Sequence, residues 1–300
     1  MIDDHTLAEL LRSKLNAPGL TLVRLPVTCI SKIYRADIPD RPSLCVKWGM
    51  VPDSKAIDFL RRFSPHPLLP RVLPDQPYAL DGKPVYCFEW RSFRRVRFDQ
   101  MSDAQFRSFL SEYRALFQMM QDFGQADPPG DGAKWHREIV SYAERHPLSR
   151  FPLKSLLALG PSDFRRPANA SLAVTHGDFH SGNFGFDGDR LSVFLDFDNL
   201  VYAYPVEDLA CAFVDGMRQG ALVGHPFRRR RLARRIASVV RDSGQPPGAW
   251  IFAVNLLRLT LAAKTLSRHA DCLRVAFNVA ARDRRIRRIL TIIRKALDVK

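Results

Sequence analysis

Three polar residues in one short stretch have the types and spacing that phosphoryl transfer requires. Asp178 and Asn183 stand five positions apart in the sequence HGDFHSGN, and Asp196 follows the apolar run Val193–Leu195. In phosphoryl transfer one carboxylate accepts the proton of the acceptor hydroxyl, while oxygen ligands hold Mg²⁺ against the nucleotide phosphates. The turn sequence Asp187-Gly188-Asp189 separates two strand-like runs. It predicts a hairpin that folds the second carboxylate back onto the loop.

The stretch resembles the catalytic loop of the aminoglycoside phosphotransferase and choline kinase family. The shared signature is H-G-D-x-x-x-x-N followed by apolar residues and D-F-D. The resemblance implies an α+β, bilobal, protein-kinase-like fold, with a small antiparallel-sheet N-lobe and a larger, mainly helical C-lobe. It also implies ATP and Mg²⁺ as cofactors, Asp178 as the catalytic base, and Asn183 and Asp196 as magnesium ligands. The alternative is a surface turn in which these residues act as turn formers and helix caps.

The resemblance assigns supporting tasks to three more residues. His176 is expected to pack and to make backbone hydrogen bonds, without transferring a proton. Asp198 is the second aspartate of D-F-D, and Asp208 in the run Pro205–Ala210 is expected to brace the loop. For His180 two alternatives stay open, because it either faces the acceptor or only fills the loop.

The nucleotide-binding residues are expected upstream of this loop. Lys47, in the strand-like run 44–48, matches the strand lysine that contacts the α- and β-phosphates in kinase-like folds. Residues 51–79 contain no Glu to pair with it, so Asp53 or Asp58 is the expected partner. Where the family often has glycines at the phosphates, this chain offers the hydroxyls of Ser31 and Thr28 and the charge of Lys32. An ordinary polar hairpin turn is the alternative for that segment.

The adenine edge is expected to meet the backbone of Glu89 and Arg91, which lie where the hinge between the lobes should be.

The elements that must position these residues follow from hydrophobic periodicity and turn signals. The sequence predicts strands at 20–27, 32–38 and 43–48, a helix at 53–63, a proline-rich connection at 64–77, and a hairpin of 78–80 with 84–90. A helix precedes them at 4–15, and a longer one, opened by a capping box of Ser102 and Gln105, extends to Phe123. Helices resume at Ala133 and again at Phe227. This order favours a nucleotide-binding N-lobe over 1–90 and a C-lobe over 91–300 that carries the catalytic loop and the acceptor-binding helices.

Composition narrows the class of protein. The five cysteines are scattered and odd in number, which is typical of buried thiols in a reducing compartment. The acidic start of the chain does not resemble a secretory signal, and no uninterrupted apolar run approaches the 18 or so residues of a membrane span. We therefore expect a cytoplasmic protein, with peripheral attachment to the inner membrane face as an open alternative.

Positive charge is concentrated in the last 84 residues. They hold 20 Lys and Arg against 4 acidic residues, a net charge of +16, while the first 216 residues have a net charge of −1. Such asymmetry suggests an anionic partner, and its alternative is a solvated, arginine-rich exterior. The apolar stripe of Ile286, Ile289, Leu290, Ile293 and Leu297 either packs on its own lobe or meets a membrane. Nucleic acid is the less favoured partner.

The acceptor is expected to be a small molecule. Position 177 is Gly, where protein kinases have the Arg that reads a phosphorylated activation loop, and Glu207 follows Asp196 by only eleven positions. With few acidic residues in the C-terminal part, the sequence favours a sugar or a sugar-containing acceptor, including anionic or lipid-linked ones such as those of the lipopolysaccharide core. An aminoglycoside or a choline-like aminoalcohol is the first alternative. The second is a degenerate nucleotide-binding protein whose basic part binds nucleic acid or a membrane.

Overall fold

The computed structural model describes residues 4–25, 32–48, 54–165, 172–218, 226–268 and 272–298. The chain divides into two compact units. Unit 1 contains Met1–Arg94, Ser108–Phe123 and Phe184–Asn199, and unit 2 contains Arg95–Arg107, Gly124–Asn183 and Leu200–Lys300. The first passage from one unit to the other comes after Arg94. Unit 1 is not continuous in sequence, because Ser108–Phe123 and Phe184–Asn199 belong to it together with the N-terminal residues.

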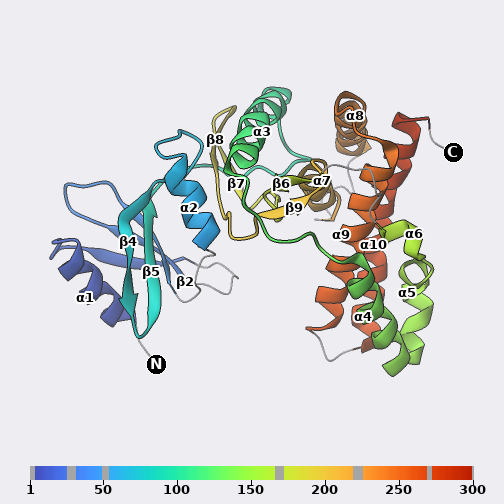
Figure 1. Ribbon diagram of the computed structural model, residues 1–300, viewed down its shortest axis with the longest axis horizontal. Helices are drawn as coiled ribbons and strands as arrows, with labels where there is room; N and C mark the ends of the chain where they lie inside the picture. The colour runs from blue at the N-terminus through green and yellow to red at the C-terminus, as the bar shows by residue number, and fades with distance from the viewer. Residues whose placement is uncertain are drawn as a thin grey trace. The chain divides into compact units, whose positions relative to one another are not determined.

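Unit 1 is built on a five-stranded antiparallel sheet with the order β1-β2-β3-β5-β4. Helix α1 (Asp4–Lys14) covers one face, where Leu7 and Leu11 pack against Tyr34 and Val46 (Figure 1). Alternation of buried and exposed side chains along β2 and β3 is the expected pattern for strands with one face on a core. The strands are β1 (Thr21–Arg24), β2 (Lys32–Asp37), β3 (Leu44–Trp48), β4 (Val72–Leu80) and β5 (Lys83–Glu89).

Strand β4 begins six residues earlier than the sequence predicts. Pro74 and Pro77 argued for a connection up to residue 77, yet the strand starts at Val72. The physical reason is its place in the sheet: β4 pairs only with β5 in the described sheet, and the register shifts between Leu73 and Tyr78. At an edge or a bulge the missing N–H of a proline costs no ladder hydrogen bond.

Two helices and a hairpin complete unit 1. Helix α2 (Ser54–Arg62) places Phe59 against Phe123 and Phe197, with ring centroids 5.4 and 4.9 Å away. Helix α3 (Asp103–Phe123) contributes its first turn to unit 2 and the rest to unit 1. Its predicted capping box is confirmed, because the Gln105 side chain accepts the N–H of Ser102 at 2.9 Å and the Ser102 hydroxyl accepts the N–H of Gln105 at 3.0 Å. The predicted hairpin is also confirmed as β7 (Phe184–Asp187) and β8 (Arg190–Phe194), with Gly188 at φ +56° in the turn.

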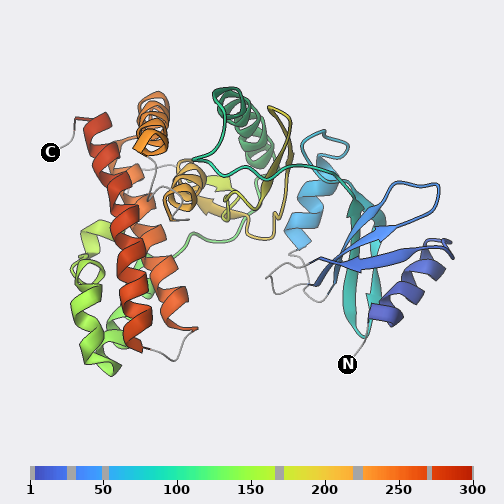
Figure 2. The same cartoon turned by 180° about the vertical axis from the view of Figure 1, so that it is seen from behind.

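Unit 2 is mainly helical. Figures 1 and 2 show α9 (Pro247–Leu266) and α10 (Cys272–Ala296) running side by side, with α4 (Gly132–Arg145) and α5 (Arg150–Leu157) against them. The remaining elements are a 3₁₀ turn (Pro147–Ser149), α6 (Pro161–Phe164), α7 (Glu207–Arg218), α8 (Pro226–Asp242) and a two-stranded sheet of β6 (Ala173–Thr175) and β9 (Val201–Ala203). The sequence had given no signal for β6 or β9.

Helix α9 is long and apolar enough to cross a membrane, and it is the one helix of that kind in the described part of the chain. About two thirds of its apolar window, 67%, is buried inside the protein. Its composition is therefore that of a core helix, surrounded by α4, α7 and α10. Arg258, a charged residue in the interior of this helix, is itself buried.

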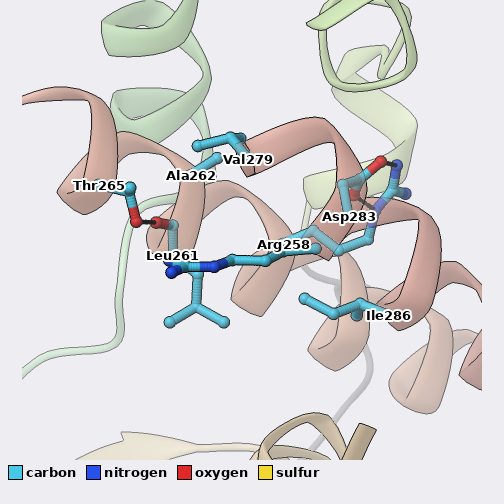
Figure 3. A pocket seen from close by; sticks show the side chains of 8 residues that line it. Arg258, Leu261, Ala262, Thr265, Val279, Asp283 and Ile286 are labelled. Carbon is cyan, nitrogen blue, oxygen red and sulfur yellow. Dashed lines mark hydrogen bonds and ion pairs between the residues drawn. The ribbon is translucent and has the colours of Figure 1, made fainter. Parts of the chain in front are cut away.

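A buried ionic network ties three helices of unit 2 together, and Figure 3 shows the Arg258–Asp283 pair at its centre. Nε of Arg258 in α9 donates to Oδ1 of Asp283 in α10 at 2.6 Å, and its Nη1 donates to Oδ1 of Asn255 at 2.7 Å. Ser155 of α5 donates its hydroxyl to Oδ2 of Asp283 at 2.7 Å. An adjacent cavity of about 20 Å³, lined in part by Thr265 and Arg282, has room for a water molecule.

The stripe on the last helix packs within its own unit. Ile286, Ile289, Leu290 and Ile293 are all buried, so this stripe is not available to a membrane. The basic cluster of α8 is partly structural too. Arg235 is 6% exposed and donates to the carbonyl of Met101 and to the carboxylate of Asp103.

Candidate active site

Two carboxylates on one helix hold the predicted catalytic loop, residues 176–183. The loop joins β6 to β7. Asp208, at the start of α7, accepts the backbone N–H groups of His176 and Gly177 at 2.8 and 3.0 Å. The expected contact between Asp208 and the loop is therefore present. His176 is fully buried, with its ring 5.5 Å from that of Phe179, as expected for a packing residue.

Asp215 is a second brace, which the sequence reasoning missed. Its Oδ2 accepts both the backbone N–H and the hydroxyl of Ser181, at 3.1 and 2.5 Å. Asp208 and Asp215 are seven residues apart on α7, so they lie two turns apart on one face of the helix. That spacing on a helical segment was the signal that could have found it. Together they fix the loop at both ends.

Asp178 lies between the two braced points of the loop. Burial alone would raise the pKa of its carboxyl, but hydrogen bonding to His180 and the positive potential of His180, His176 and Lys264 hold that pKa below its ordinary value. Lys264, an exposed residue of α9, was not anticipated from the sequence. A carboxylate with a lowered pKa stays ionised at neutral pH and can accept a proton.

Asn183 is oriented by the same loop. Its Nδ2 donates to the backbone carbonyl of Asp178 at 2.8 Å, and its own N–H donates to the carbonyl of His180 at 2.9 Å. Because the amide nitrogen is the donor in the first of these bonds, the oxygen Oδ1 is the atom left to bind a cation. Asn183 thus fits the ligand chemistry predicted for it.

Lys47 belongs to unit 1 and pairs there with both aspartates of the D-F-D sequence. Its Nζ lies 3.1 Å from Oδ1 of Asp196 and in contact with Oδ2 of Asp198. Burial would lower the pKa of Lys47, but the two carboxylates raise it above its ordinary value. Burial raises the pKa of Asp198, and the ammonium of Lys47 opposes that rise.

These pairs correct one expectation. Asp58 is one of the two aspartates that were expected to replace the missing helix Glu as the partner of Lys47, but it is exposed on α2. Among the described residues it makes no ion pair with Lys47. Asp196 and Asp198 neutralise the ammonium of Lys47 in its place. Asp53 lies outside the described residues.

The backbone at Asp196 is set by Phe197. This ring is buried against Phe59 of α2, so it anchors the D-F-D segment in the core of unit 1. Asp196 itself adopts φ +62°, a left-handed conformation that costs a non-glycine residue about 1–2 kcal/mol. Strain of this kind persists where the surroundings impose it, and it is concentrated at functional sites.

The other predicted nucleotide contacts are only partly described. Ser31 and Thr28 lie outside the described residues. Lys32 places its ammonium 4.6 Å from the centre of the Trp48 ring. The N–H of Glu89 donates to the carbonyl of Arg71 at 2.9 Å, so only the carbonyl of Glu89 remains for a base edge.

The side chain of Arg91 is held within unit 1. It donates to the carbonyl of Pro67 and lies 3.4 Å from the carboxylate of Glu89.

Solved structures similar to this chain are small-molecule phosphotransferases. The amicoumacin kinase hAmiN, in complex with AMP-PNP, Ca²⁺ and amicoumacin, has a TM-score of 0.62 at 12% identity over 93% of this chain and 94% of that one. Spectinomycin phosphotransferase APH(9)-Ia, with ADP and spectinomycin, has a TM-score of 0.62 at 12% identity over 99% of both chains. Macrolide 2′-phosphotransferase MphH from Brachybacterium faecium has a TM-score of 0.57 at 14% identity, over 92% and 97%. At these identities the likeness shows the protein-kinase-like fold.

A comparison with curated proteins finds no match. The family model is decisive instead, because it matches residues 54–247, which contain the catalytic loop, both bracing aspartates and the D-F-D sequence. With well over half of its length matched, the chain belongs to the phosphotransferase enzyme family.

Proposed function

We propose that this phosphotransferase moves the γ-phosphoryl group of ATP to a hydroxyl of a small molecule in a Mg²⁺-dependent reaction. The observation that supports this best is the loop itself. Asp208 and Asp215 hold it through backbone hydrogen bonds, and it presents a carboxylate, Asp178, with a lowered pKa. Asp178 accepts the proton of the attacking hydroxyl as the new O–P bond forms and the bond to the leaving ADP breaks.

Two residues each have the ligand chemistry that suits a magnesium ion. Asn183 offers Oδ1 and Asp196 offers a carboxylate, both hard oxygen ligands of the kind that Mg²⁺ prefers. When bound, the ion neutralises charge on the phosphates during transfer. The AMP-PNP and Ca²⁺ of the amicoumacin kinase complex, and the ADP of the spectinomycin phosphotransferase complex, support a nucleotide and a divalent metal here.

Lys47 has the chemistry of a phosphate ligand. In the described structure its ammonium is neutralised by Asp196 and Asp198. A nucleotide phosphate would compete with these carboxylates for the same ammonium, while a metal ion would take over the charge of Asp196. We therefore propose unit 1 as the nucleotide-binding part and unit 2 as the acceptor-binding part.

The acceptor is an anionic or neutral sugar-like molecule in this proposal. The three acidic residues near the loop that would attract a cation are occupied by backbone groups. Glu207 accepts the N–H of Tyr204 at 2.9 Å, and Asp208 and Asp215 accept those of the catalytic loop. Lys264, in contrast, projects positive potential onto Asp178. A phosphate or carboxylate on the acceptor would meet an attractive charge there.

The second candidate is an aminoglycoside-type or aminoalcohol acceptor. The similar structures favour it, since their names give amicoumacin, spectinomycin and macrolides as the molecules on which those proteins act. A degenerate nucleotide-binding protein is the candidate of another class, and it predicts no turnover with any acceptor.

An ADP-release assay on three panels of hydroxyl compounds separates these candidates: sugar phosphates and uronic acids, neutral sugars, and aminoglycosides with choline. We expect turnover with the first or second panel. For an anionic acceptor, Lys264→Gln should raise KM about tenfold, as expected when one charge-assisted contact is lost, while Lys154→Gln, an exposed control on α5, leaves KM unchanged. Turnover restricted to the third panel, with KM indifferent to Lys264, would contradict the proposed acceptor class.

A further inference from the structure

His180 makes two directional contacts in the loop around Asp178. Its Nδ1 accepts the backbone N–H of Gly182 at 2.9 Å. Since the neutral imidazole carries one proton, an accepting Nδ1 places that proton on Nε2. Nε2 lies 3.6 Å from Oδ2 of Asp178. The loop backbone therefore selects the tautomer whose N–H faces the carboxylate.

The ring has space because residue 182 is a glycine. A Cβ at this position would stand 2.6 Å from Cε1 and 2.9 Å from Nδ1 of His180. The φ angle of Gly182 lies outside the left-handed region, so its backbone conformation does not require a glycine. Glycine is required here because a side chain would occupy the space of the imidazole ring. On the other side, the bonds from Ser181 to Asp215 fix the backbone that carries the ring.

We propose that His180 is a positioning residue that holds the carboxylate of Asp178 for proton transfer. This inference rests on the proposed function of Asp178 as the base. The Nε2–H group engages Oδ2 and leaves Oδ1 to take the proton of the attacking hydroxyl. A contact of 3.6 Å is long for a hydrogen bond, and contacts of this kind tighten as the reacting complex forms. Hydrogen bonding to His180 is also among the causes that lower the pKa of Asp178.

The first test reads the tautomer directly. In protein labelled with ¹⁵N-histidine, the His180 signals are those that disappear in His180→Gln. We expect the Nδ1 shift of an acceptor nitrogen and the Nε2 shift of a protonated one. A ring with its proton on Nδ1 would overturn the proposal, whatever the activity.

The second test measures kcat for MgATP hydrolysis, with water as the acceptor. His180→Leu, which has no donor, should lower kcat about 10- to 100-fold, as misplaced catalytic groups do, with little change in the KM for ATP. His180→Gln can place an amide N–H near the position of Nε2, so its kcat should stay within about threefold of wild type.

A double-mutant cycle supplies the control. Gly182→Ala displaces the ring and should lower kcat as much as His180→Leu does. In the double variant the two losses should not multiply, because both remove one contact. Wild-type kcat in His180→Leu, or losses that multiply, would contradict the proposal. If Asp178→Asn retains full turnover the proposed base is wrong, whereas an inactive Asp178→Asn beside an active His180→Leu rejects the positioning role alone.

Discussion

At the scale of single residues, the candidate metal-binding oxygens and the lysine ammonium come from two separate parts of the chain. Asp178 and Asn183 come from a loop braced by α7 in unit 2, while Lys47, Asp196 and Asp198 form one ionic cluster in unit 1. Each group is constrained by a neighbour that does no chemistry itself. Phe197, for example, is buried so that the aspartates on either side of it stay with Lys47.

Asp196→Ala should remove metal-dependent nucleotide binding, and Asn183→Ala should weaken it, because both lose a hard oxygen ligand. The measurement is a thermal-shift titration with ATP, with and without Mg²⁺. A ligand at about 100 times its Kd stabilises by about 2.7 kcal/mol, so loss of binding is visible as a lost shift in Tm. Asp187→Ala, an exposed change in β7, serves as the control. Equal Mg²⁺-dependent shifts for wild type and Asp196→Ala would rule out this ligand.

The identities of these residues could be predicted, but several of their partners could not. The spacing of Asp178, Asn183 and Asp196 is a property of the sequence. The pairing of Lys47 with Asp196 and Asp198 depends on a tertiary contact across about 150 positions. No local pattern carries that information, and the absence of a Glu in 51–79 favoured Asp53 or Asp58 as the partner instead.

At the scale of elements, α7 links the helical core to the catalytic loop. Asp208→Ala should leave the N–H groups of His176 and Gly177 without their acceptor. A buried donor without a partner costs about 1–3 kcal/mol, so the free energy of unfolding should fall by that amount in urea titrations. The kcat should fall further than stability alone explains, because the loop loses its fixed geometry. Glu138→Ala, an exposed change on α4, is the control, and a fully active Asp208→Ala would contradict the brace.

The buried network of α5, α9 and α10 should be more important for stability than for catalysis. Asp283→Ala leaves the guanidinium of Arg258 buried without its carboxylate, which typically costs about 3–5 kcal/mol. Arg287→Ala removes only the 44% exposed partner of the same carboxylate and should cost about 0–1 kcal/mol. Chemical denaturation of both variants tests the difference. Equal small losses would mean that the pair contributes little.

Most elements could be predicted because their signals are local. The capping box of Ser102 and Gln105 and the turn at Gly188 depend on residues within a few positions. Strand β4 could not be placed, since prolines are tolerated only where a strand is at an edge, and edges are decided by tertiary pairing. Strands β6 and β9 have three residues each, and their paired residues are 26 to 30 positions apart in the sequence.

At the scale of the whole molecule, the uneven charge remains the strongest feature of composition. Part of the C-terminal positive charge, a net of +16, is neutralised by ion pairs. Arg235 and Arg258 are buried, and each pairs with an aspartate of unit 2. Arg230 and Arg234 on α8 are exposed. Their charge is available to attract an anionic acceptor.

Acceptor KM should therefore rise steeply with salt, because exposed charges are screened beyond about 8 Å at physiological ionic strength. Arg230→Glu with Arg234→Glu should reproduce that rise at low salt without changing kcat. The same change of charge at Lys14 and Lys83 in unit 1 should have no effect, since both are exposed there on α1 and β5. An acceptor KM that is flat with ionic strength would leave the basic exterior as a solvated surface only.

The central claim is that Asp178 accepts the proton of the hydroxyl that receives the phosphoryl group. Its most direct test is Asp178→Asn, compared with wild type for ADP release from MgATP and for MgATP binding by calorimetry. We expect kcat to fall about 10²–10⁴-fold, the usual contribution of a general base, while the Kd of MgATP changes little. A correctly folded Asp178→Asn enzyme that retains its kcat would show that the base lies elsewhere in the protein.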